Sequence, residues 1–123
     1  MSILGMIRRL GAIADVYRPV AAVGTGGLAD VTWPTGPVSR NLRGIPDVIA
    51  DELARKIFGH ETIVELRLVV DRATDIEKDD GVVFRTGAYA GEHFRVTSVV
   101  PSVVPGRSAH LEVALERTTE AFG

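Results

Sequence analysis

The sequence has no cysteine among its 123 residues. Disulfides and thiolate metal sites are therefore excluded, and the composition suits a reducing compartment. Long apolar runs are also missing, since none approaches the ~20 residues that a membrane-spanning helix needs. Arg8 and Arg9 interrupt the apolar N-terminal stretch, which therefore lacks the pattern of a secretory signal. We expect a protein that is made in the cytoplasm and has no membrane partner.

A strong charge of either sign is absent as well. The 14 basic and 16 acidic side chains leave a net charge of −2. Proteins whose main task is to coat nucleic acid are usually strongly basic, so this class is disfavoured. Aromatic residues are few, at 6% of the chain, and none is interleaved with arginine on one strand face as a stacking platform for single-stranded nucleic acid requires.

The second half of the sequence is rich in two-residue alternation of apolar and polar side chains. This alternation predicts four strands, at residues 62–70, 82–86, 93–100 and 109–117. In the third strand, Phe94, Val96 and Val100 share the apolar face. Turn residues at 79–81, 87–91 and 101–106 link the strands. Sequential hairpins of this kind predict an antiparallel meander that curls into a small barrel, because closure covers the edges.

The first half adds a hairpin and a long insertion. Residues 15–23 and 29–35 predict two strands joined by a glycine-rich turn at 24–27, which gives a mainly β chain of about six strands. Residues 36–60 then form an insertion between the second and third strands. Asp47 as N-cap and Gly59 as terminator predict a helix within it. Connections of this length tend to be functional, and we expect that shortening this one leaves folding intact.

The chain is long enough for one domain, residues 1–123. Its expected parts are an N-terminal helix or arm (1–13), the first hairpin (14–35), the insertion (36–60), the meander (61–117) and a tail (118–123). The arm is either a frayed terminus or a segment that orders on a neighbouring subunit, because so short a helix needs a surface to dock on.

No group of residues matches a known chemical site. The glycine-rich turn lacks the Gly-Lys-Ser/Thr ending of a phosphate-binding loop. The acidic run after Asp75 fails as a calcium loop, because its glycine comes one place late and Thr86 stands where glutamate is needed, so we expect a solvated turn. His60, His93 and His110 share no ligand spacing and are expected at the surface. We therefore predict no enzyme activity, cofactor or metal.

The order of elements nevertheless resembles a known family. A short hairpin with a glycine turn and a Trp (DVYRPVAAVGTGGLADVTWPT) precedes the long insertion, the acidic phrase TDIEKDDGVVFRTG, the strand AGEHFRVTSVV and a last strand HLEVALER. The acidic turn before an aromatic-x-Val-x-x-Val strand, here residues 94–99, is the recurring pattern. Over residues 14–117 the sequence resembles the head-closure (stopper) or head–tail joining proteins of tailed bacteriophages.

The resemblance implies a small β-barrel protein of the virion neck, made in the host cytoplasm. It implies a homo-oligomeric ring that binds the portal or adaptor ring on one side and a tail terminator or tail tube protein on the other. Packaged double-stranded DNA would pass through without sequence-specific contact, and a loop would obstruct the channel. The matching loop here is 36–60, whose candidate gating residues are Arg40, Asn41, Arg43, Arg55 and Lys56. The candidate contacts with other copies or partners are Ile3, Met6, Ile7, Trp33 and Phe122.

Two alternatives remain open at this point. The chain is either another neck component, such as a tail terminator or completion protein, or an OB-like barrel that binds single-stranded nucleic acid or oligosaccharide. The net charge and the few aromatics disfavour the second.

Overall fold

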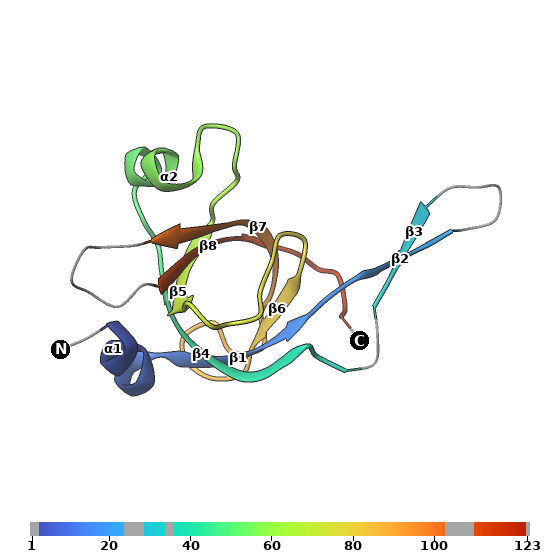
Figure 1. Cartoon of the computed structure of the whole chain (residues 1–123), viewed down its shortest axis with the longest axis horizontal. Coiled ribbons are helices and arrows are strands. Elements are labelled where there is room, and N and C mark those ends of the chain that lie inside the picture. The colour runs from blue at the N-terminus through green and yellow to red at the C-terminus, as the bar shows by residue number, and fades with distance from the viewer. Residues whose placement is uncertain (1–2, 24–28, 34–35, 103–109, 123) are drawn as a thin grey trace.

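A computed structural model describes residues 3–23, 29–33, 36–102 and 110–122. Six antiparallel strands close into a barrel, a separate two-stranded sheet projects from it, and two short helices lie at the opposite end (Figure 1). The prediction of a small, mainly β barrel of six strands is therefore confirmed. Within the described part of the chain, no helix is long and apolar enough to cross a membrane.

The barrel consists of two three-stranded meanders. The first contains β1 (Ala12–Tyr17), β4 (Ser39–Asp47) and β5 (Leu66–Asp71), and the second contains β6 (Gly81–Phe84), β7 (His93–Ser102) and β8 (His110–Arg117). The barrel closes where β5 pairs with β8 and β1 pairs with β6. The prediction that the last four strands form one meander is wrong for β5, which pairs with β4 and β8 and not with β6.

Alternating apolar side chains fill the barrel as the sequence predicts. Leu66, Leu68 and Val70 of β5 are fully buried, and the rings of Phe84 and Phe94 meet edge to face with centroids 5.5 Å apart. The prediction that Val100 shares the core-facing side of β7 with Phe94 and Val96 is wrong. A register shift between Val96 and Ser98 reverses the alternation in β7, so that Val99 packs against the core in place of Val100.

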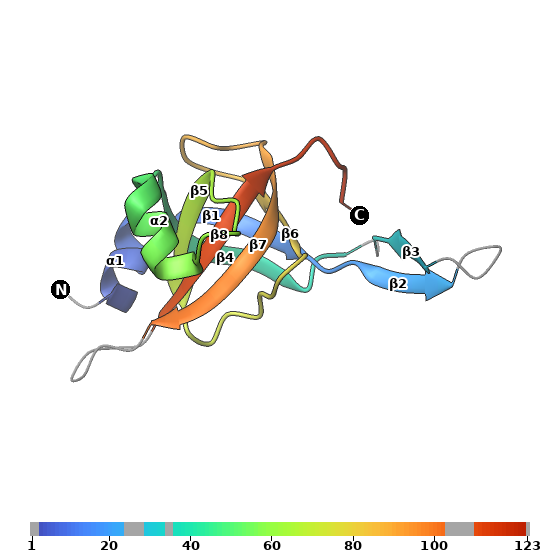
Figure 2. The ribbon, with the colours of Figure 1, turned by 90° about the horizontal axis from the view of Figure 1, so that it is seen from above.

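The first predicted hairpin is two separate pieces. Its first strand is interrupted after Tyr17: β1 belongs to the barrel, while β2 (Val20–Val23) pairs with β3 (Ala29–Thr32) in the separate sheet. Figure 2 shows this sheet standing away from the barrel. The turn predicted at 24–27 lies outside the described residues, as do 103–106 of the turn predicted after Pro101.

The insertion predicted at 36–60 is largely a barrel strand. β4 pairs with β1 on one side and with β5 on the other, so shortening this segment would remove part of the barrel wall. The strand was missed because it shows little apolar alternation. Gly44 faces inward without a side chain, and a Cβ there would lie 2.6 Å from Leu68 Cδ1, so the neighbouring strand supplies the apolar volume.

Both predicted helices are present, with shifted limits. α2 (Asp51–Phe58) begins after Ala50, because Asp47 belongs to β4; Gly59 ends it with φ of 91° and donates its N–H to the Arg55 carbonyl. α1 (Ile3–Leu10) docks on β4 and β5 of its own barrel, where Ile7 is buried. The surface that a short helix requires is thus provided within the chain.

Candidate functional site at the base of the hairpin

The candidate site is the base of the β2–β3 hairpin, where two chain segments join it to the barrel. Arg18 lies on the first segment, between β1 and β2, and Trp33 follows β3 on the second. Each side chain contacts a part of the chain that is distant in sequence: Arg18 contacts the connection from β5 to β6, and Trp33 contacts the C-terminal segment. These contacts fix how the hairpin leaves the barrel.

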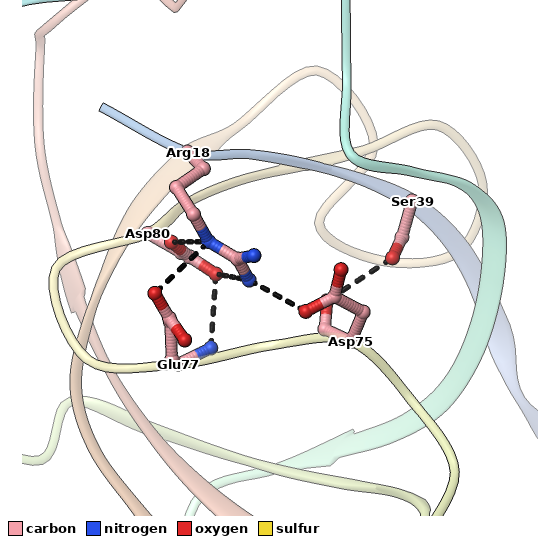
Figure 3. A network of polar contacts seen from close by, with 5 residues as sticks. All are labelled: Arg18, Ser39, Asp75, Glu77 and Asp80. Carbon is pink, nitrogen blue, oxygen red and sulfur yellow. Dashed lines mark hydrogen bonds and ion pairs between the residues drawn. The ribbon is translucent and has the colours of Figure 1, made fainter. Parts of the chain in front are cut away.

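Arg18 is held by three carboxylates (Figure 3). Its Nε and Nη2 donate to the two oxygens of Asp80 at 3.1 and 3.0 Å, and Nη2 also donates to Asp75 Oδ1 at 2.8 Å. Glu77 completes the set with an ion pair of 3.2 Å. The hydrogen bond to Asp80, followed by that to Asp75, raises the pKa of Arg18. The guanidinium therefore stays charged across the physiological range.

Asp80 corrects the prediction of a solvated acidic turn. Its side chain is only 1% exposed, and besides the two bonds from Arg18 it accepts the backbone N–H of Glu77 at 2.9 Å. A buried carboxylate requires this degree of pairing, because its desolvation is costly. The acidic run is a loop folded around Arg18, and the Ser39 hydroxyl at the start of β4 donates to the Asp75 carbonyl.

Aromatic rings hold the second segment. Trp33 Nε1 donates to Glu120 Oε1 at 2.7 Å, and the Trp33 and Phe122 rings meet with centroids 4.5 Å apart. Phe122 is 7% exposed and also stacks on Tyr17 and His93. A Cβ at Gly81 would lie 2.7 Å from the Phe122 ring, so glycine makes room for it. The predicted tail thus packs against the barrel and the hairpin base.

The predicted partner contacts therefore have neighbours within the chain. Trp33 and Phe122 contact each other. Ile7 is buried where α1 docks on the barrel, while Met6 is half-buried. Ile3 lies in the first turn of α1. Their contact with other subunits stays a prediction.

The predicted gating residues do not lie in one loop. Arg40, Asn41 and Arg43 lie on β4, whereas Arg55 and Lys56 lie on α2 beyond the other end of that strand. All five are exposed. Asn41 has φ of 54°, so β4 is irregular at this residue. Its Oδ1 accepts a hydrogen bond from Arg85 Nη1 at 2.7 Å, which stabilises the irregular backbone. The segment that projects is β2–β3. The sequence did not predict how this hairpin is held, because Arg18 and Asp80 are 62 residues apart and no local pattern links them.

A second polar cluster lies on the outer face of β5 and β8. Arg67 donates to both carboxylate oxygens of Asp47, and Glu112 Oε1 is 2.9 Å from His110 Nε2. The hydrogen bonds to Asp47 raise the pKa of Arg67. His110 is buried, so its predicted surface position is wrong; His60 is exposed as predicted, and His93 is half-buried beneath Phe122.

The geometry defines a class of fold: a closed six-stranded antiparallel barrel with a hairpin standing off one end. No protein-family model matches the chain, and a search of the curated proteins finds no match. Two solved structures are similar to it at 16% identity. The solution structure of protein SF1141 from Shigella flexneri 2a has a TM-score of 0.62, with coverage of 92% of this chain and 99% of that one. The phage-like element PBSX protein xkdH from Bacillus subtilis has a TM-score of 0.52, with coverage of 88% and 94%. At this identity the likeness concerns the fold.

Proposed function

We propose that this chain is a non-enzymatic structural protein of a phage, a phage-like element or a gene transfer agent. More specifically, it is a neck protein that closes the portal channel after DNA packaging and joins the head to the tail. The observation that carries the proposal is the fold shared with the PBSX protein over 94% of that chain's length. The order of sequence elements, matched to the head-closure family without reference to the fold, supports the same class of protein.

The geometry suits a subunit of a ring. The barrel is closed, and the hairpin leaves it between the contacts of Arg18 on one side and Trp33 on the other. The projecting hairpin and the barrel together provide two different surfaces, which a cyclic assembly needs because its contacts are heterologous. The helices lie at the end of the barrel away from the hairpin and supply a further surface (Figure 2).

The proposed partners are further copies of the chain, the portal or adaptor ring, and a tail terminator or tail tube protein. Double-stranded DNA is contacted at most through phosphates, for which Arg40, Arg43, Arg55 and Lys56 are exposed candidates. The net charge of −2 fits this role, because a channel lining should not hold DNA that must later slide through it.

The proposal is tested by deleting the gene from its particle and complementing it with the intact chain. We expect heads that package DNA but lose it and fail to join tails, with both defects restored by complementation. Retention of DNA and normal tail joining in the deletion would contradict the proposal. Heads that keep their DNA, combined with binding of the purified chain to free tail tubes, would instead identify a tail completion protein.

A further inference from the structure

The two strands of the projecting hairpin have open edges. β2 pairs with β3 through four residue pairs, from Val20–Thr32 to Val23–Ala29, and within the described ranges neither strand has a second strand neighbour. Figures 1 and 2 show that the sheet stands clear of the barrel. A lone two-stranded hairpin is marginally stable in water, and its outer N–H and C=O groups are a template for another strand.

Two other strand stretches with a neighbour on one side carry features that block such pairing. Residues 98–102 of β7 pair with β8 alone, and Pro101 lies among them. Residues 39–43 of β4 pair with β1 alone; there Asn41 has positive φ and the register shifts between Ala14 and Val16. Proline and irregular backbone are the usual means of blocking a free edge. β2 has neither, because its sequence is Val-Ala-Ala-Val, without charge or proline.

The hairpin is also held in place for pairing. Arg18 contacts the buried Asp80 at one end of the hairpin, and Trp33 contacts the packed C-terminal segment at the other. Contacts at both ends reduce the orientational freedom that association would cost. The base of the hairpin also exposes apolar surface, since Val20 is 53% exposed.

We propose that hairpins of successive copies pair side by side, with the free edge of β2 against the free edge of β3 in the next copy. This proposal rests on the ring of the proposed function and names its interface. Both strands have four residues and run antiparallel, so β2 beside the next β3 continues the same alternation. β2 is uncharged and β3 has the single charge of Asp30, so no like charges oppose. Each copy offers one edge of each kind, and such a heterologous contact repeats until the ring closes.

The absence of cysteine from the chain permits a clean cross-linking test. One batch carries Val20→Cys and another carries Thr32→Cys; both positions are exposed and lie at the base of the hairpin. The two are mixed and assembled into rings, or co-expressed and assembled into particles, and then treated with a short bismaleimide. Ala88→Cys, on the exposed connection between β6 and β7, replaces either partner as the control.

We expect mixed Val20→Cys/Thr32→Cys dimers in at least tenfold excess over either homodimer and over any product with Ala88→Cys. Predominant Val20→Cys homodimers would overturn the proposal, because they would show a symmetric contact. Rings or particles without hairpin cross-links would also overturn it while leaving the neck function intact. If the rings cross-link through the hairpins but deletion of the gene spares DNA retention and tail joining, the hairpin contact is supported and the neck function is contradicted.

Two proline variants provide a second test. In an antiparallel pair, successive residues direct their N–H groups alternately inward and outward. Ala21→Pro and Ala22→Pro therefore remove one inward and one outward donor. We expect one of them to abolish cross-linking while the fluorescence of Trp33 at the hairpin base stays that of the parent. Full cross-linking in both variants would overturn the edge contact.

Discussion

Arg18 shows at the scale of single residues how a polar side chain organises a loop. Its guanidinium spans Asp75 and Asp80, and the loop that carries these carboxylates wraps around it (Figure 3). Asp80 has no access to water, so Arg18 supplies most of the compensation that its charge requires. The direction of the hairpin therefore depends on Arg18 just before it as well as on Trp33 just after it.

Replacing Arg18 by methionine should be strongly destabilising, because it leaves the Asp80 carboxylate buried without a cation. We expect a loss of about 3 kcal/mol in the free energy of unfolding, measured by urea titration. Arg72→Met is the matched control, since Arg72 is exposed in the same connection and its loss should cost less than about 0.5 kcal/mol. Equal stabilities of the two variants would refute the role of Arg18.

The pH dependence of the Arg18 contribution follows from its raised pKa. A group with a raised pKa in the folded state contributes its full stabilisation below the unfolded pKa and loses it only as the pH rises through the folded value. For an arginine this window lies far above neutrality. The stability difference between the parent and the double variant Arg18→Met/Asp80→Asn, which leaves no unpaired carboxylate buried, should therefore be constant from about pH 6 to about pH 9 in repeated urea titrations. A steep decline within that range would contradict this account.

Sequence reasoning identified the apolar positions at this scale but missed the polar pairs. Leu66, Leu68 and Phe94 follow a two-residue period, which is a local signal. The partnership of Arg18 with Asp80 has no local signal, because the fold alone brings the two together. The acidic run is evident in the sequence, but the sequence does not distinguish a buried aspartate such as Asp80 from an exposed one such as Asp75.

At the scale of elements, β4 depends on a residue without a side chain. Gly44 lets Leu68 and Val70 approach the strand, and this is why a segment with few apolar residues forms part of the wall. The sequence signal for a strand was weak there for the same reason. Its proline and glycine, Pro46 and Gly44, favoured an insertion, whereas pairing with β1 and β5 on both sides outweighs that local preference.

Substituting Gly44 by alanine should therefore strain the barrel. The new Cβ would lie within 2.9 Å of Val70 and closer still to Leu68, so both side chains must shift. We expect a loss of about 1–3 kcal/mol in thermal or urea unfolding. Gly36→Ala is the control, because the nearest atom to its Cβ is Arg40 Nη2 at 3.8 Å. If Gly44→Ala were as stable as Gly36→Ala, the tight approach of β4 and β5 would be wrong.

The C-terminal segment is an element that the sequence presented as a plain tail. Phe122 lies over Gly81 and between Trp33 and Tyr17, so it joins the hairpin base to the barrel. The helix or strand propensities of the residues in this segment do not predict the contacts of Phe122. A single aromatic residue near the end of a chain has no periodic pattern, and its packing partner had to be seen in three dimensions.

Phe122→Ala should release this contact, and the single tryptophan of the chain reports on it. We expect the emission of Trp33 to shift to longer wavelength, because its ring loses the neighbour at 4.5 Å, together with a loss of roughly 1.5–3 kcal/mol in stability. Thr119→Ala, at an exposed position of the same segment, should change neither. Unchanged emission in Phe122→Ala would show that the segment does not hold the hairpin.

At the scale of the whole molecule, the fold class was predictable because it follows from strand number and alternation. The strand order was not, since the pairing of β5 with β8 joins segments that no local pattern links. The projecting sheet was expected as part of the barrel and proved to be separate from it. The division into a closed barrel and a projecting hairpin is the property on which the proposed assembly depends.

The most direct test is electron cryomicroscopy of DNA-filled, tailed particles that contain this chain. The account predicts a closed ring of these barrels between the portal and the tail, with each hairpin against that of the next subunit. A complete neck with no density for this barrel, or the chain found elsewhere in the particle, would contradict the central claim.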